Sequence, residues 1–105
     1  MKNILLACSS GMSTSLLVKK MQDIAKERGI EAEIWAVSQD KAEIYMEKAD
    51  VLLLGPQMRF MKRKFSKKAD ELGVPIDSID PVAYGRVDGA AVLDKALDLI
   101  GKKPL

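Results

Sequence analysis

Residues 4–15 read Ile4-Leu-Leu-Ala-Cys-Ser-Ser-Gly-Met-Ser-Thr-Ser15, an apolar run that gives way to small polar residues. A short uninterrupted apolar run is typical of a strand that is buried on both faces of a sheet. The amphipathic stretch that follows, over about 13–28, predicts a helix that ends at Gly29. Its predicted buried stripe contains Leu17, Met21, Ile24 and Arg28, and is widened by Leu16 and Ala25. The opening of the chain therefore predicts a strand, a polar loop and a helix.

The alternation of strand and helix continues to the end of the chain. Further strands are predicted over 30–37, 51–54 and 74–79, helices over 38–48, 57–72 and 88–100, and a turn-rich connector over 80–87. This order predicts an α/β fold with a four-stranded parallel sheet, order 2-1-3-4, covered by helices on both faces. Right-handed crossovers make it flavodoxin-like. The mixed face of 30–37 and the early Pro75 place these two strands at the edges. We expect one domain over residues 1–105.

The composition excludes several kinds of chemistry. The 105 residues contain no histidine and one cysteine, so His-based catalysis, His-ligated metals and an intrachain disulfide are excluded, and no metal or cofactor is expected. The formal charge is +2, from 17 Lys and Arg against 15 Asp and Glu, which does not favour nucleic acid as a partner. No run is long enough for a signal peptide or a membrane span. These features predict a cytoplasmic protein.

Ligands of such sheets bind beyond the carboxyl ends of the strands, which here are followed by residues 8–13, 55–57 and 80–88. Cys8 lies in the first of these segments. The backbone N–H groups after Cys8 and the first turn of the helix favour an anion, and Gly11 lets the backbone approach it closely. The predicted phosphate-binding residues are Ser9, Ser10, Gly11, Met12, Ser13, Thr14 and Ser15.

The same donors favour the thiolate of Cys8, so we predict a nucleophilic cysteine. A cysteine at the end of a strand can instead be a small buried apolar residue, and that alternative stays open. Cysteine phosphatases of this layout need an Arg six positions after the nucleophile, where this chain has Thr14. Without a guanidinium to stabilise hydrolysis, the loop is better suited to carrying a phosphoryl group. The alternatives are a small cysteine phosphatase, an arsenate-reductase-like enzyme, and a non-catalytic anion-binding module.

Three segments together resemble a known family. They are Cys8-Ser-Ser-Gly-Met-Ser-Thr-Ser-Leu-Leu-Val18, Asp50-Val-Leu-Leu-Leu-Gly-Pro-Gln57 and Tyr84-Gly-Arg-Val-Asp-Gly89. The chain resembles the enzyme IIB component of the lactose/cellobiose (chitobiose) branch of the bacterial phosphoenolpyruvate-dependent sugar phosphotransferase system. It also resembles low-molecular-weight phosphotyrosine phosphatases in its layout.

The resemblance implies a phosphotransferase in which Cys8 accepts a phosphoryl group from a phosphohistidine of enzyme IIA. Cys8 would then donate it to a disaccharide held by the membrane permease, enzyme IIC. Because two partners must reach the sulfur, we expect Cys8 at an accessible surface of a monomer. Met12 is predicted to contact the partners, and Gln57, Tyr84 and Arg86 to form the rim of the site.

Several residues outside these segments carry weaker predictions. Met58 and Met61 are candidates to extend the partner surface, although core packing is expected for at least one of them. Trp35 and Tyr45 are predicted to be half-buried packing residues. The basic cluster on the third helix is predicted to be a solvated face; it contains Arg59, Lys62, Arg63, Lys64, Lys67 and Lys68.

Overall fold

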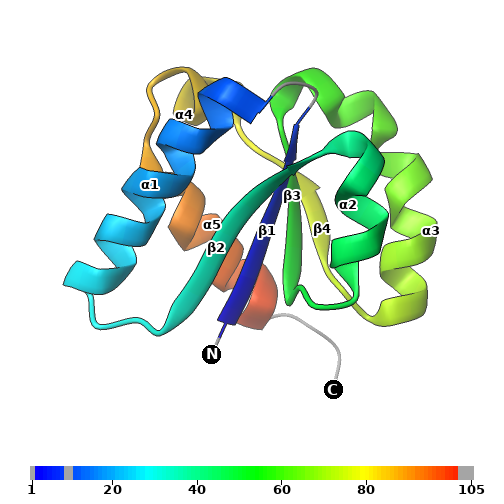
Figure 1. The fold of residues 1–105 in the computed structure, drawn as a ribbon, viewed down its shortest axis with the longest axis horizontal. Coiled ribbons are helices and arrows are strands. Elements are labelled where there is room, and N and C mark those ends of the chain that lie inside the picture. Colours follow the sequence, from blue (N-terminus) through cyan, green and yellow to red (C-terminus); the bar gives the residue numbers. More distant parts are fainter. Residues whose placement is uncertain (1, 9–10, 102–105) are drawn as a thin grey trace.

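The computed structural model describes residues 2–8 and 11–101, apart from the side chains of residues 11–13 and 59. Strands and helices alternate along the chain, as predicted (Figure 1). The strands are β1 (Lys2–Cys8), β2 (Ala32–Ser38), β3 (Val51–Leu54) and β4 (Ile76–Ser78). The helices are α1 (Gly11–Glu27), α2 (Gln39–Met46), the 3₁₀ helix η1 (Pro56–Met61), α3 (Lys62–Leu72), α4 (Pro81–Gly85) and α5 (Gly89–Gly101).

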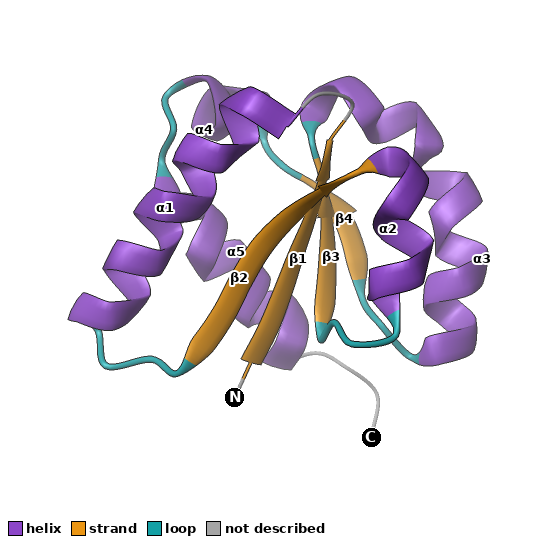
Figure 2. Cartoon of the chain, viewed as in Figure 1, coloured by secondary structure: helices purple, strands orange, loops and turns teal. Residues whose placement is uncertain are grey.

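The four strands form one parallel sheet in the order β2-β1-β3-β4, which confirms the predicted topology and both edge strands. Helices α1 and α5 lie on one side of the sheet and α2 and α3 on the other (Figure 2). Each side has its own apolar core. Ile4 and Leu6 of β1 belong to the core under α1 and α5, whereas Leu5 and Ala7 belong to the core under α2 and α3. The alternation of side chains along a strand explains why the apolar run is continuous.

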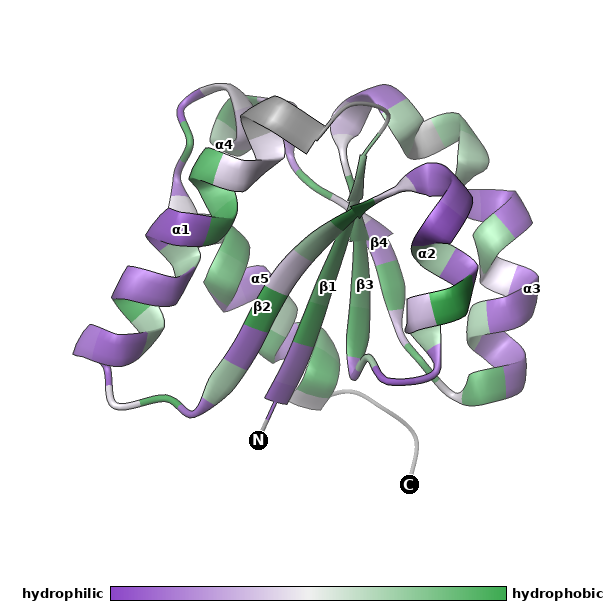
Figure 3. Ribbon diagram, viewed as in Figure 1, coloured by the Kyte–Doolittle hydropathy of each residue, from purple (hydrophilic) through white to green (hydrophobic). Residues whose placement is uncertain are grey.

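Hydropathy follows this arrangement, since β1 and β3 are apolar along most of their length (Figure 3). All four residues of β3 are buried, which confirms it as an interior strand. The helix ends are also as expected: Gly29 and Gly73, which follow α1 and α3, have φ of 68° and 70°. Glycine adopts this left-handed conformation without steric cost, so it ends both helices cleanly.

Three local predictions are wrong. The connector over 80–87 contains the short helix α4, because the Asp80 carboxylate accepts a hydrogen bond from the backbone N–H of Ala83 at 3.0 Å and Pro81 fits the first helical turn. The segment predicted as one helix over 57–72 begins as the 3₁₀ helix η1 and becomes α-helical only at Lys62. The predicted buried stripe of α1 is wrong at Leu16, which is 52% exposed, and at Arg28, which lies beyond the end of the helix and is exposed; Leu17 is buried as predicted, and Val18 is buried as well.

β4 is fixed to its neighbours by a charged network. The Asp77 carboxylate lies 3.0 Å from Lys62 Nζ of α3 and 3.3 Å from Lys95 Nζ of α5. Partial burial acts to raise the pKa of Asp77, but the hydrogen bonds from Lys62 and from the backbone N–H of Ser78, together with both lysine charges, outweigh it and lower the pKa. Lys62 is therefore part of an ion pair, although its side chain remains 44% exposed.

Candidate functional site

The carboxyl ends of three strands meet at one edge of the sheet. Ala7 pairs with Leu54, and Leu54 pairs with Ser78. The contact continues beyond the strands, since the backbone N–H of Gly55 donates to the Ala7 carbonyl at 2.9 Å and that of Ile79 donates to the Leu54 carbonyl at 2.8 Å. The three segments predicted to build the site are therefore adjacent in space.

Cys8 is the last residue of β1 and lies three residues before the start of α1. Its side chain is fully buried, with 0% exposed, and it belongs to the core that also contains Ala42 and Met58. Its Sγ lies 3.9 Å from the carbonyl oxygen of Val37, the partner of Ala7 on β2. The prediction of an accessible sulfur is thus wrong for this conformation. The physical reason is that the end of β1 is packed beneath the α2 side of the sheet, where apolar side chains surround it.

The predicted phosphate-binding loop divides into two parts. Ser9 and Ser10 lie outside the described residues. From Gly11 onward the backbone is helical, so α1 begins two residues earlier than predicted, and Met12 belongs to its first turn rather than to a loop tip. The first N–H groups of a helix have no intrahelical partner and carry partial positive charge. The first turn of α1 begins three residues after Cys8, so these N–H groups are close in sequence to the sulfur. An anion-binding site beside the sulfur needs such donors nearby.

Thr14 and Tyr84 join two of the three segments. Thr14 Oγ1 lies 3.1 Å from Tyr84 Oη, across a sequence separation of 70 residues. Thr14 is 1% exposed, so its hydroxyl is buried where a cysteine phosphatase would have its arginine. The geometry therefore places a neutral hydrogen-bonded pair at this position, and Tyr84 packs against the core under α1 and α5.

The other predicted residues are distributed around the same edge. Gln57 is exposed, and its side chain lies over Gly55: a Cβ atom at Gly55 would be 3.0 Å from Gln57 Oε1. Arg86 is exposed at the end of α4, and Ser15 is exposed on α1. The structure brings Gln57 to the end of β3 beside Ala7, whereas Arg86 lies at the far end of the α4 turn.

Sequence reasoning missed three exposed apolar side chains on elements at this end of the molecule. Phe60 of η1 is 78% exposed, Val82 of α4 is 61% exposed, and Leu16 of α1 is 52% exposed. Each lies on an element that begins just beyond the carboxyl end of a strand. Large exposed apolar side chains on neighbouring elements are typical of protein–protein contacts.

Met58 and Met61 are the two methionines predicted either to extend the partner surface or to pack in the core. Met58 is 1% exposed and Met61 packs against the core under α2 and α3, so core packing is confirmed for both.

Two further properties concern the described part of the chain. Across residues 2–8 and 11–101, no group of three or more Cys, Asp or Glu side chains is arranged to hold a metal ion. None of the helices in these ranges combines the length and the apolar character needed to cross a bilayer.

The comparison with protein families decides the identity. Residues 3–95 match the model of the family described as "PTS system, Lactose/Cellobiose specific IIB subunit". The chain belongs to this IIB family. The resemblance inferred from the three sequence segments is thereby confirmed.

Individual relatives of the IIB chain agree with this assignment. It is 56% identical to the oligo-beta-mannoside-specific EIIB component of Bacillus subtilis (strain 168), over 95% of this chain and 97% of the relative. It is 47% identical to the cellobiose-specific EIIB component of Lactococcus lactis subsp. lactis (strain IL1403), over 94% and 96%. The fold matches the lactose-specific IIB domain structure from Streptococcus pneumoniae with a TM-score of 0.84 at 18% identity, over 93% and 96%.

As a IIB component, the chain is a phosphotransferase and a phosphoryl carrier of the sugar phosphotransferase system. It works with the IIA and IIC components of that system. The names of these relatives specify different sugars, an oligo-β-mannoside in one and cellobiose in the other, so the family assignment does not identify the sugar that this chain serves.

Proposed function

We propose that Cys8 carries the phosphoryl group, within one carrier domain over residues 1–105 that acts in the cytoplasm as a monomer. The observation that supports this most directly is the place of the one cysteine in the chain, at the carboxyl end of β1 and immediately ahead of the first turn of α1. The chain contains no histidine, so the phosphohistidine that donates the group belongs to IIA.

The reaction consists of two transfers. In the first, the Cys8 thiolate attacks phosphorus, the S–P bond forms, and the P–N bond to the IIA imidazole breaks. In the second, a sugar hydroxyl on IIC attacks phosphorus and loses its proton, the O–P bond forms, and the thiolate leaves. The protein supplies position and charge stabilisation. The backbone N–H groups and hydroxyls of residues 9–15 would hold the phosphoryl oxygens at the positive end of α1.

Burial of Cys8 adds a condition to this mechanism. In-line attack needs the sulfur on the side of phosphorus opposite the leaving nitrogen, a position that a sulfur with 0% of its side chain exposed does not reach. Transfer therefore proceeds from a conformation in which Sγ has left the Val37 carbonyl. Local openings of this kind occur in native proteins at a small free-energy cost.

We propose that exposed apolar side chains contribute to the surface that meets both partners. Leu16, Phe60 and Val82 are exposed on elements that follow the carboxyl ends of strands, and Met12 is proposed to contribute to the same surface. Gln57, Tyr84 and Arg86 are proposed to form its polar rim. For the sugar, we propose a disaccharide of the cellobiose, chitobiose or lactose type, bound by IIC.

A cysteine phosphatase is the second candidate, since it shares the layout of strand, cysteine, loop and helix. The buried pair Thr14–Tyr84 argues against it, because a neutral hydroxyl occupies the sequence position where such a phosphatase has the arginine that stabilises the transition state of hydrolysis.

The test is phosphorylation in a reconstituted system. The protein is incubated with phosphoenolpyruvate, the general phosphotransferase proteins and a IIA component, and intact mass is measured. We expect one phosphoryl group on the wild type and on Ile44→Ala, a control at an exposed position of α2, and none on Cys8→Ser. Phosphorylation of Cys8→Ser would contradict the proposal. Sustained, Cys8-dependent hydrolysis of p-nitrophenyl phosphate would favour the phosphatase.

A further inference from the structure

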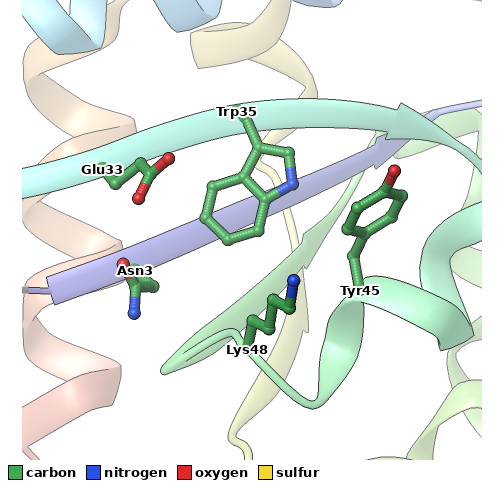
Figure 4. A pocket seen from close by; sticks show the side chains of 5 residues that line it. All are labelled: Asn3, Glu33, Trp35, Tyr45 and Lys48. Atoms are coloured by element: carbon green, nitrogen blue, oxygen red, sulfur yellow. The ribbon is translucent and has the colours of Figure 1, made fainter.

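A cavity of about 660 Å³ opens at the amino half of the sheet, far from the Cys8 end. Its lining residues are Asn3 of β1, Glu33 and Trp35 of β2, and Tyr45 and Lys48 at the end of α2 (Figure 4). Figure 1 shows why it exists: the lower halves of β1 and β2 have no helix in front of them. The volume lies within the range of small-molecule sites.

The sheet forms the floor of this cavity and α2 forms its wall. Asn3 pairs with Glu33, and Leu5 pairs with Trp35, so these side chains share one face of the sheet. Leu5 is in the core on that face and Trp35 packs against the same core, which fixes the indole from below. In Figure 4 the Trp35 ring is seen face-on, with Tyr45 beside it and Lys48 below the two rings.

The chemistry of the lining selects a ligand class. Two aromatic rings offer apolar faces to a flat apolar surface. Around them, Asn3 both donates and accepts hydrogen bonds, Glu33 accepts and Lys48 donates, so the formal charges of the lining cancel. A free anion would face Glu33, and a plain hydrocarbon would displace water from the exposed Glu33 and Lys48 without replacing its hydrogen bonds. A neutral ligand with an apolar ring face and hydroxyls at its edge satisfies all five residues.

We propose that this cavity, the Trp35 pocket, binds a neutral saccharide. The site goes beyond the phosphoryl transfer proposed above and does not depend on it. Trp35 pairs with Leu5, which lies three residues before Cys8 on β1, about 10 Å at roughly 3.3 Å per residue, and the sulfur is buried, so a sugar in the pocket does not touch it. It is a binding site without chemistry. Because the pocket is open on one side, we expect dissociation constants of about 1 mM.

The one tryptophan of the chain makes the test direct, because all tryptophan emission comes from Trp35. The full chain is titrated with cellobiose and with β-1,4-mannobiose while the emission is recorded. We expect a saturable blue shift. In Tyr45→Ala and in Lys48→Ala, which keep the reporter, we expect at least tenfold weaker binding, and in Ile44→Ala, the exposed neighbour of Tyr45, no change.

A change of emission that is absent or does not saturate would overturn the proposal. Saturable binding of adenosine monophosphate in place of the sugars would also overturn it, since the pocket would then prefer an anion. Equal weakening by Ile44→Ala would show that the signal does not come from the pocket. Circular dichroism verifies that each variant is folded. Cys8→Ser separates the two proposals: we expect it to lose phosphorylation and to keep the Trp35 response.

Discussion

The two ends of the β1–β2 pair differ in what covers them. At the carboxyl end, the Cys8 side chain is fully buried and its Sγ faces the carbonyl of Val37. At the amino end, Trp35 packs on the same side of the sheet but lines an open cavity. Both residues lie on the side of α2 and α3, so the difference comes from helix placement and not from strand polarity. The end that carries the reactive atom is closed, and the end without one is open.

The closed end joins several elements that are distant from one another in the chain. Gly55 and Ile79 continue the sheet beyond its strands, and Thr14 contacts Tyr84. At the open end, the floor consists of two adjacent strands, and its wall is the end of one eight-residue helix. A phosphoryl site needs several elements to converge on one atom, whereas a shallow ligand site needs only a surface left uncovered.

The largest expected effect separates the two ends by reactivity. Cys8 in the native protein should react with a disulfide reagent at least about 100-fold more slowly than in urea, because reaction requires a local opening worth roughly 2.7 kcal/mol. Acrylamide should quench Trp35 emission readily in the same native sample. Absorbance of the released thiol and fluorescence measure the two rates. Rapid reaction of Cys8 without denaturant would remove the contrast.

The second effect tests the packing that supports the closed end. A Cβ at Gly89 of α5 would lie 3.0 Å from backbone atoms of Lys20 and Met21 of α1. Gly89→Ala should therefore lower the free energy of unfolding by about 1–3 kcal/mol. Gly85→Ala is the control, because nothing lies within 4 Å of a Cβ there. Urea unfolding of both variants measures the difference, and equal stabilities would show that α5 can shift at no cost.

A smaller effect tests the polar contact of the closed end. Tyr84→Phe removes the partner of the buried Thr14 hydroxyl and should cost about 1 kcal/mol. Tyr45→Phe, at the open end, should change stability by less than about 0.5 kcal/mol. A double-mutant cycle with Thr14→Val isolates the interaction. Additive losses in that cycle would show that the contact contributes nothing.

The smallest effect concerns β4, at the opposite edge of the sheet from Trp35. Because the pKa of Asp77 is lowered in the folded protein, its ionisation stabilises the fold above the ordinary Asp pKa of about 3.9. That contribution, roughly 0.5 kcal/mol for a partly exposed ion pair, should disappear as the pH falls through the lowered value. The Asp77→Asn variant should lack this pH-dependent stabilisation. The Asp70→Asn variant, changed at an exposed position of α3, should keep it. Unfolding curves from pH 6 down to about pH 2 measure this, and parallel curves for wild type and Asp77→Asn would refute it.

The sequence by itself determined the order of strands and helices, the parallel sheet, both edge strands and the glycine helix ends. It also placed Cys8 at the start of the first crossover. These features depend on local periodicity, backbone preferences and the handedness of crossovers, all of which are encoded in neighbouring residues.

Only the tertiary structure decided which side chains are covered. It buried the Cys8 sulfur, exposed Leu16 and Phe60, joined Thr14 to Tyr84 and left Trp35 beside an open cavity. Periodicity marks the apolar face of an element, but burial depends on how far the neighbouring helices extend over that face. Those lengths and positions result from contacts between residues far apart in the chain, which no local pattern records.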